Sequence, residues 1–523
     1  DAARVNVGQQ AIVRALEACQ SGDVEQLKRL VDDVELRQRW GTTWLWVAGS
    51  EGHVGVVSEL LDAGVGVNEP PGPAVAGAVQ LAEYFTERPN DCARFAGGAT
   101  VLYIACAHGR GAVVERLVQV DGLDVNQART DNGATPLYVA CHEGHVGVVE
   151  RLVRVQGLDV NQARTNGGET PLYAACGKGH VEVVERLVQV DGLDVNQART
   201  DDGETPLYVA CEEGLVKVVE RLLEVDGLDV NQACTHNGAT PLYMACWNGH
   251  VEVVERLVQV DGLDVNQART NGGETPLYAA CWNGRVEVVG RLVQVDGLDV
   301  NQARNTGATP LYVACQEGHV KVVERLVQVG GLDVNQARTY GGATPLYVAC
   351  QYGHVEVVER LLEVDGLDVN QARTDDGRTP LIAACEMDHV GVVELYAALC
   401  ARDAWQARAM VRVLQAAVDN HALSSFHCIF SMNAGALCAS TLLRDNVRTW
   451  PEPFASVLLQ ELTWRRRRAL LAMARMLRIG RASVRTRLGR RALLAMARML
   501  RIGRASVRTR SGIRWRGSHV GCS

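Results

Sequence analysis

Cysteine and histidine are the residues of this chain that could do chemistry, and both are numerous. The 523 residues include 16 cysteines and 13 histidines. Cysteine can form disulfides, bind zinc or act as a nucleophile, and histidine can bind a metal or transfer a proton. The spacing of these residues along the chain decides which of these chemistries is possible.

Ten of the cysteines recur at one position of a repeated segment, and they are Cys19, Cys106, Cys141, Cys176, Cys211, Cys246, Cys281, Cys315, Cys350 and Cys385. Stacked helices lie about 8 to 10 Å apart, whereas a disulfide needs Cα atoms within about 7 Å. We therefore expect a ladder of buried, unbridged thiols, which indicates a reducing compartment and a cytoplasmic location. No Cys-x-x-Cys pair is present, so we expect no metal site.

Seven histidines share a second position of the repeat, directly after a glycine or aspartate, and they are His53, His145, His180, His250, His319, His354 and His389. Leu215 and Arg285 replace histidine in two units. A position that accepts leucine is not a catalytic base or a ligand, so we predict a polar contact that stabilises a turn. No Ser-His-Asp set, phosphate loop or His-Glu-x-x-His motif is found. We expect no catalytic residue, no cofactor and no small-molecule substrate.

The repeated segment is the strongest signal in the chain. It begins at Gly133 as GATPLYVACHEGHVGVVERLVRVQGLDVNQART and returns to about residue 380. Its threonines recur every 35 residues, with a single step of 34, at Thr135, Thr170, Thr205, Thr240, Thr275, Thr309, Thr344 and Thr379. Thr100 and, less cleanly, Thr43 extend the series towards the N-terminus. A fixed period of this length indicates a solenoid.

Each unit predicts a pair of short helices. Thr135 before Pro136 is typical of an N-cap followed by proline at the first helical position. We expect this first helix to run to about His142, where Gly144 ends it. A turn signal such as Asp-Asn-Gly precedes each threonine and predicts a projecting hairpin turn.

The second helix of the unit is expected over residues 145–155. Its apolar spacing predicts a buried stripe at Val146, Val149, Leu152 and Val153. Gly157 is placed to end this helix in the left-handed conformation. Two such short helices cannot offset their ordering entropy alone, so stability must come from stacking neighbouring units.

These residues resemble the ankyrin repeat, whose core is Gly-x-Thr-Pro-Leu-His-x-Ala-Ala-x-x-Gly-His-x-x-Val-Val-x-x-Leu-Leu. The resemblance covers roughly residues 11–395. Tyr138 and its equivalents replace the family's histidine, Cys141 and its equivalents replace the second alanine, and each linker is two residues longer. The resemblance implies an all-α fold: an α-solenoid of about eleven stacked ankyrin repeats, each a helix pair with a projecting turn.

Two interruptions predict the domain boundaries. The step from Thr43 to Thr100 is 57 residues, which leaves about 22 extra residues, with a short helix expected over residues 75–85. After Val393 the linker is missing and a helical cap is expected, ending near residue 420. The expected order is an N-terminal capping repeat (1–40), a first ankyrin-like repeat (41–68), an insertion loop (69–97), the array (98–395), a C-terminal helical cap and linker (396–463) and an arginine-rich tail (464–523).

The repeats differ from each other mainly in the turn before the threonine and in the two residues after Ala-Cys. In the ankyrin family these positions line the concave face, so the resemblance implies a surface for a partner protein. The candidate binding residues are His142, Glu143, Glu212, Glu213, Trp247, Asn248, Trp282, Asn283, Gln316, Tyr340 and Tyr352.

Trp247 and Trp282 occupy equivalent positions where other units carry polar residues or glycine, so we interpret them as an exposed interface anchor. The alternative is that both rings simply cover their own helices. Glu212 and Glu213, with Asp201 and Asp202, form an adjoining acidic stretch. This combination favours a partner with an apolar side chain flanked by basic residues, bound by a monomeric scaffold.

The last sixty residues have a different composition. Residues 464–523 contain 18 arginines, no lysine and no acidic residue, so the net charge of −8 divides into −26 and +18. The segment RRALLAMARMLRIGRASVRTR occurs twice, from Arg467 and from Arg490. A basic amphipathic helix that binds anionic membrane or nucleic acid is one interpretation. A disordered extension, a contact with the acidic repeats and a mistaken gene model are the others.

Three functions follow, in order of support. The first is a protein–protein interaction scaffold or adaptor, with no enzymatic activity. The second is a tethering protein whose tail binds membrane or nucleic acid. The third is the regulatory part of a longer enzyme, because the chain begins at Asp1 without methionine and can be a fragment. No apolar run of 18 residues is present, which argues against a membrane span.

Overall fold

The computed structural model describes residues 2–71, 86 and 88–402. Within this part of the chain all regular secondary structure is helical, and the helices form two N-terminal pairs and nine array pairs, eleven in all. This confirms the predicted all-α solenoid. The array lies in one unit, Asp1–Val392, and a second unit begins at Val393. The predicted helix over 75–85, the array end near residue 420 and the arginine-rich tail all lie outside the described residues.

The N-terminal helices are α1 (Ala2–Ser21), α2 (Val24–Val31), α3 (Val34–Glu51), α4 (Val54–Asp62) and α6 (Pro89–Ala96). The first helices of the array units are α7 (Val101–Ala107), α9 (Pro136–Glu143), α11 (Pro171–Lys178), α13 (Pro206–Glu212), α15 (Pro241–Asn248), α17 (Pro276–Trp282), α19 (Pro310–Gln316), α21 (Pro345–Tyr352) and α23 (Pro380–Glu386). The second helices are α8 (Gly111–Leu117), α10 (Val146–Leu152), α12 (Val181–Leu187), α14 (Val216–Leu223), α16 (Val251–Leu257), α18 (Val286–Leu292), α20 (Val320–Leu326), α22 (Val355–Leu362) and α24 (Val390–Arg402).

The predicted helix caps are confirmed. The Thr135 hydroxyl accepts a hydrogen bond from the backbone N–H of Tyr138 at 3.0 Å, and Pro136 occupies the first helical position. Gly144 then ends α9 with a φ of 78°, a left-handed conformation that favours glycine. The threonine cap at the helix start recurs in the other array units, so each first helix starts at a fixed place relative to its turn.

The second helix is shorter than predicted. Helix α10 ends at Leu152, and tight turns follow in which the N–H of Val155 donates to the carbonyl of Leu152 at 2.9 Å. Gly157 does have a positive φ of 82°, but it lies in the loop and not at the helix end. Of the predicted stripe, Val149 and Leu152 are buried and Val146 and Val153 are only half-buried, while Val148 is buried as well. A helix of seven residues has only about two turns, so it buries only the few side chains that face the neighbouring helices.

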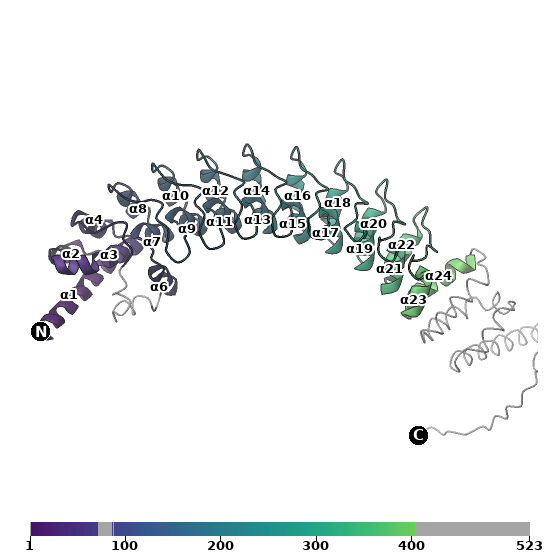
Figure 1. Ribbon diagram of the computed structural model, residues 1–523, viewed down its shortest axis with the longest axis horizontal. Coiled ribbons are helices and arrows are strands. Elements are labelled where there is room, and N and C mark those ends of the chain that lie inside the picture. The colour runs from purple at the N-terminus through teal and green to yellow at the C-terminus, as the bar shows by residue number, and fades with distance from the viewer. Residues whose placement is uncertain (1, 72–85, 87, 403–523) are drawn as a thin grey trace, which may run out of the picture. The chain divides into compact units, whose positions relative to one another are not determined.

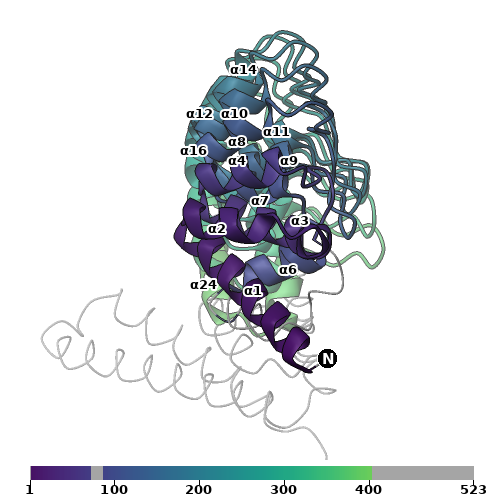
Figure 2. The same ribbon diagram turned by 90° about the vertical axis from the view of Figure 1, so that its left-hand side faces the viewer.

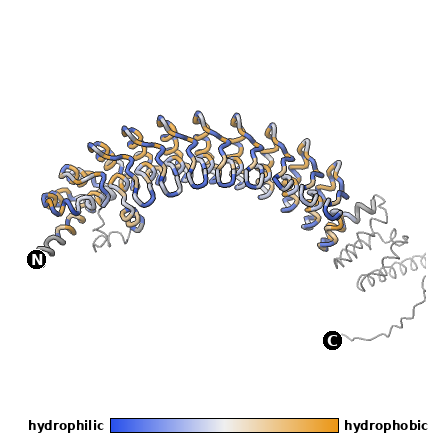
Figure 3. Tube along the Cα trace, in the orientation of Figure 1, coloured by the Kyte–Doolittle hydropathy of each residue, from blue (hydrophilic) through white to orange (hydrophobic). Residues whose placement is uncertain are grey.

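The helix pairs stack in a row in which like helices meet. Each first helix packs on the first helices of the units before and after it, and the second helices from α8 to α22 pack on one another in the same way. In Figure 1 the first helices and the projecting turns lie on the inner side of the arc, and the second helices lie on the outer side. Figure 2 shows the turns and loops gathered on one side of the helix layers. Hydrophobic residues concentrate in the helices, and the inner turns are mainly hydrophilic (Figure 3).

The repeated histidines join each second helix to the preceding unit. The Nε2–H of His180 donates to the backbone carbonyl of His142 at 3.0 Å, and the other six histidines make the equivalent contact at 2.8 to 3.0 Å. Arg285 replaces histidine and donates from Nε to the Trp247 carbonyl at 3.2 Å. The predicted polar contact is confirmed, but it joins two units and does not stabilise a turn within one.

The longer linkers are joined by a ladder of asparagines. The Asn196 amide donates to the Gly227 carbonyl at 2.8 Å, and its Oδ1 accepts from the Asp229 N–H at 2.8 Å. Equivalent pairs of hydrogen bonds are made by Asn68, Asn126, Asn161, Asn231, Asn266, Asn301 and Asn335. The linkers therefore form an ordered edge in which each loop is fixed by the preceding one.

The tyrosines that replace the family's histidine form a second ladder with arginines. The Arg199 guanidinium lies over the Tyr173 ring, with Cζ 5.3 Å from the ring centroid. Arg129, Arg164, Arg269, Arg304, Arg338 and Arg373 lie in the same way over tyrosines of the preceding units, at 5.4, 5.5, 5.5, 5.7, 5.8 and 5.3 Å. Cys234 takes the arginine position beside Tyr208 and is buried in an apolar cluster with Ala239.

The N-terminal units depart from the predicted pattern. Thr43 was expected to align with the capping threonines, but it lies buried inside α3, which starts at Val34 under the cap of Asp33. Trp44 follows it in place of proline, so nothing prevents the helix from continuing through this position. Helix α6, in the insertion, was not predicted.

The cysteine ladder is buried as predicted. All ten cysteines are buried, with 0% exposure for each, and none of them forms a disulfide. Burial raises the pKa of these thiols, for example those of Cys141 and Cys176, because the thiolate is poorly solvated there. The ladder thus packs as a row of small apolar side chains.

Candidate functional site

The candidate residues lie on the inner side of the array, at the C-terminal ends of the first helices and in the turns beside them (Figure 1). The threonine cap and proline fix where each first helix begins. The residues after Ala-Cys therefore occupy equivalent places in every unit. These places differ from unit to unit in chemistry, and the structure divides them into five groups.

Trp247 is an exposed aromatic side chain on a fixed base. Its side chain is 36% exposed, and its ring stacks on Tyr243, with centroids 6.2 Å apart and planes at 21°. Burial raises the pKa of Tyr243 to about 12, which keeps this phenol neutral. Asn248 donates from Nδ2 to the Glu212 carbonyl at 2.9 Å and so ties α15 to α13. Trp247 is therefore held in place beside the acidic end of α13.

Trp282 differs from Trp247, although sequence treats them as equivalent. Its ring lies at 5.9 Å from Tyr278, and the Arg304 guanidinium covers it at 5.9 Å. The side chain is half-buried. Asn283 turns back and donates to the Ala279 carbonyl at 3.2 Å. Of the two tryptophans, Trp247 offers the more accessible surface, and the amides of Asn248 and Asn283 are both used within the protein.

Glu212 and Glu213 make an unneutralised acidic end on α13. Glu213 is exposed and Glu212 half-buried, and no ion pair joins either to another described residue. Partial burial, followed by repulsion from Glu204, Glu213 and Asp202, raises the pKa of Glu212. A cationic group placed here would relieve this repulsion.

His142 and Glu143 are committed to contacts within the protein. The Arg94 guanidinium of α6 donates to Glu143 at 2.8 Å. The His142 ring stacks on Tyr138 at 6.1 Å, and its Nδ1 lies 3.6 Å from Glu143. Partial burial lowers the pKa of His142. Helix α6 therefore contacts this end of the candidate surface through Arg94.

Gln316, Tyr340 and Tyr352 come together in one hollow of about 410 Å³ between α19 and α21. Tyr340 and Tyr352 are 67% and 54% exposed, so two aromatic side chains stand at an open site. Sequence comparison of the units missed the arginines that line this hollow, Arg338 and Arg373. The signal was present: an arginine six residues before Thr344 and Thr379, as in most units.

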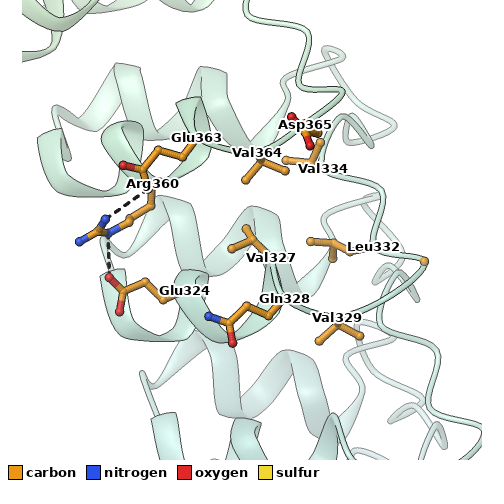
Figure 4. A pocket seen from close by; sticks show the side chains of 11 residues that line it. Glu324, Val327, Gln328, Val329, Leu332, Val334, Arg360, Glu363, Val364 and Asp365 are labelled. Carbon is orange, nitrogen blue, oxygen red and sulfur yellow. Dashed lines mark hydrogen bonds and ion pairs between the residues drawn. The ribbon is translucent and has the colours of Figure 1, made fainter.

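A second kind of hollow occurs on the outer side, between consecutive second helices and their loops. The one of about 700 Å³ shown in Figure 4 is lined by Val327, Leu332 and Val364, and Arg360 joins Glu324 at 2.7 Å and Glu363 at 3.2 Å. Equivalent hollows occur at residues 255–296 and 185–226. Since nearly the same residues line each of them, they follow from the repeat and carry no unit-specific chemistry.

Comparison with known proteins decides the family. The family model for ankyrin repeats (3 copies) matches residues 74–164, 149–234, 227–304, 261–338, 296–373 and 333–402, together more than half of the chain. The chain belongs to the ankyrin repeat family. Among solved structures, the crystal structure of the ankyrin repeat domain of Bcl-3, described as a unique member of the IkappaB protein family, is 28% identical. The match has a TM-score of 0.40 and covers 44% of this chain and 99% of that one. The search of curated proteins gave no match.

Ankyrin repeats are in general protein–protein interaction modules, and they are typically not catalytic. Within residues 2–71, 86 and 88–402, no three His, Cys, Asp or Glu side chains are grouped so that they could hold a metal ion. No helix in the described part of this ankyrin protein is both long and apolar enough to span a membrane.

Proposed function

We propose that this ankyrin protein is a scaffold or adaptor that binds a partner protein on the inner face of its array. The observation that carries the proposal is Trp247, which is 36% exposed and stacked on Tyr243. An ordered, exposed tryptophan loses little conformational entropy on binding and presents a large apolar surface, which is why tryptophan is common at interface hot spots.

The surroundings of Trp247 define the partner's chemistry. Glu212 and Glu213 lie at the end of the neighbouring first helix, and neither forms an ion pair with a described residue. We therefore expect a partner segment with an apolar side chain for Trp247 and basic residues beside it. The buried cysteines of the array, which form no disulfides, support a reducing compartment, such as the cytoplasm, as the place of this interaction.

The test is capture of partners from a cell extract with the full chain, followed by affinity measurement with the purified partner. Trp247→Ala combined with Trp282→Ala is expected to weaken binding at least tenfold. Trp247→Ala alone should account for most of this loss, because Trp282 is half-buried under Arg304.

The matched control is Arg256→Ala on α16, on the outer side of the same unit, where Arg256 pairs with Glu220 at 2.7 Å. It should leave partner affinity within about twofold, since an exposed ion pair contributes little. Equal affinity of the wild type and the double tryptophan variant, with both folded by circular dichroism, would overturn the proposal.

A further inference from the structure

One arginine of the tyrosine ladder lacks the carboxylate that the others have. In the described part of the chain six of the seven stacked arginines also pair with a carboxylate, and the pairs are Arg129–Asp131, Arg164–Glu169, Arg199–Glu204, Arg269–Glu274, Arg304–Glu274 and Arg373–Asp375. Arg338 forms no ion pair with any residue that the structure describes. The ladder is therefore charge-compensated everywhere except at this unit.

The reason lies in the projecting turn of this unit. Elsewhere the carboxylate comes from an aspartate four residues before the threonine or a glutamate one residue before it. Before Thr344 these two positions hold Tyr340 and Ala343. The preceding unit supplies no carboxylate either. Arg304 pairs with Glu274 of the unit before it, but the equivalent position in the unit before Arg338 holds Ala308. Among the described residues, no carboxylate lies within ion-pairing distance of Arg338.

The guanidinium of Arg338 keeps most of its donors unused. It lies over Tyr312, with Cζ at 5.8 Å from the ring centroid, and donates one long hydrogen bond of 3.4 Å to the Tyr312 hydroxyl. Its Nε is buried and has no hydrogen-bond partner. Arg129 and Arg164 also have an unpartnered Nε, but their terminal nitrogens bond carboxylates. A guanidinium has five N–H donors, and a carboxylate can accept two of them at once.

This guanidinium lines the hollow between α19 and α21. Exposed Tyr340 and Tyr352 stand at the same hollow, together with Gln316 and Gln351. The one carboxylate in its lining is Asp375, which is paired with Arg373. The lining thus has one uncompensated positive charge beside two accessible aromatic rings.

We propose that this hollow, the Arg338 hollow, binds a carboxylate side chain of the partner together with an adjacent apolar or aromatic group. The inference rests on the proposed function, because it assigns the carboxylate to the partner that binds the inner face. Carboxylate is favoured over phosphate because six equivalent arginines in the same array already bind carboxylates in this setting. In the other units a turn of the protein itself supplies the carboxylate that pairs with the arginine. At Arg338 the partner supplies this carboxylate.

The position of the Arg338 hollow sets the spacing of the partner's charges. It lies three to four units from the acidic end of α13, and stacked helices are about 8 to 10 Å apart, which gives about 24 to 40 Å. An extended chain rises about 3.3 Å per residue. The partner segment therefore carries its basic residues and its acidic residue about 7 to 12 positions apart, with the apolar side chain for Trp247 between them.

The test uses 3-phenylpropionate as the probe and 3-phenylpropanamide as its neutral match, with binding to the full chain followed by saturation-transfer NMR. We expect millimolar binding of the acid and at least tenfold weaker binding of the amide. Ala343→Glu places an internal carboxylate where Glu169, Glu204 and Glu274 stand in other units, and it should weaken binding of the acid at least tenfold. Ala343→Gln, of similar size and without charge, should keep the affinity within about threefold.

Equal binding of the acid by the Ala343→Glu and Ala343→Gln variants would overturn the proposal, since the probe would then bind elsewhere, for instance at the arginines of residues 464–523. Phenyl phosphate binding tenfold tighter than the acid, and lost in Ala343→Glu, would overturn the choice of carboxylate. Failure of the proposed function is seen separately, as undiminished partner affinity of the double tryptophan variant.

Discussion

The imidazole of His180 crosses the boundary between two units and donates from Nε2 to the backbone carbonyl of His142, 3.0 Å away. A carbonyl oxygen only accepts, so Nε2 carries the proton in this contact. The carbonyl belongs to the last turn of α9, where no helical N–H remains to satisfy it. The repeated histidine is thus a helix-end contact between units, and this explains its regular recurrence without any catalytic role.

Loss of this contact should destabilise one interface of the array. We expect His180→Ala to lower the free energy of unfolding by about 1 kcal/mol, through the lost hydrogen bond and packing. His180→Leu should cost less, because the natural Leu215 packs against Gly179 of the preceding unit. Urea denaturation of the three proteins measures this. An unfolding midpoint of His180→Ala equal to that of the wild type would refute a structural role for the histidine.

The asparagine ladder should behave as a second interface element. Asn196→Ala removes a hydrogen bond from the Asn196 amide to Gly227 and one from the Asp229 N–H to Asn196. We expect a loss of about 1 to 3 kcal/mol. Asn196→Asp keeps the acceptor and loses the donor, so its cost should be smaller. Hydrogen exchange should show faster opening of residues 191–196 and 226–231 in the alanine variant, and unchanged exchange there would contradict the assignment.

The buried thiols should be unreactive in the folded protein. Burial raises the pKa of the ladder thiols, so little thiolate is present at neutral pH. Cys92 is exposed and should react. Iodoacetamide labelling with peptide mapping should modify Cys92 in the native state and the ladder cysteines only after denaturation. Labelling of Cys176 at the rate of Cys92 would show that the ladder is accessible.

Ionised Glu212 should lower the free energy of unfolding at neutral pH, although it favours binding of a basic partner. Its pKa is raised, by partial burial and then by repulsion from Glu204, Glu213 and Asp202. The stability that its protonated form contributes is fully present below the pKa of an unfolded glutamate, about 4.3, and is lost as the pH rises through the folded pKa. Glu212→Gln should therefore raise the unfolding free energy at pH 7, by less than about 1 kcal/mol at this partly exposed site.

Two further results would check this account of Glu212. The stability gain of Glu212→Gln should vanish below about pH 4, where both side chains are neutral. The same variant should weaken binding of a partner with basic residues. Thermal unfolding across pH and one affinity measurement give both values. A variant that is less stable than the wild type at pH 7 would contradict the predicted repulsion.

Much of the fold could be predicted because its determinants are local. Thr135 and Pro136 fix a helix start within four residues, and Gly144 fixes its end. These signals recur, so one unit predicts the next. Thr43 shows the limit: without a following proline, the preceding cap at Asp33 started a longer helix that passes through it. The shorter α10 shows another limit, because tight turns directly after Leu152 replace the helical hydrogen bonds that the apolar pattern predicted.

The candidate surface was harder to predict because burial depends on the neighbouring unit. Trp247 and Trp282 have equivalent sequence positions, but only Trp282 has an arginine from the following turn over its ring. Arg338 was missed because every array unit except one carries a similar arginine. What distinguishes Arg338 is that it lacks the carboxylate with which the other arginines form ion pairs. Such a difference is visible only when the carboxylates of the other units are seen to reach their arginines.

The most direct test of the inner-face account is hydrogen exchange of the full chain with and without its captured partner, read by mass spectrometry. On binding, the inner turns at residues 200–204 and 235–238 and those at 339–343 should become protected. The outer loops at residues 191–194 and 226–229, which belong to the same units, should exchange as before. Protection confined to the outer loops, with the inner turns unchanged, would contradict the account.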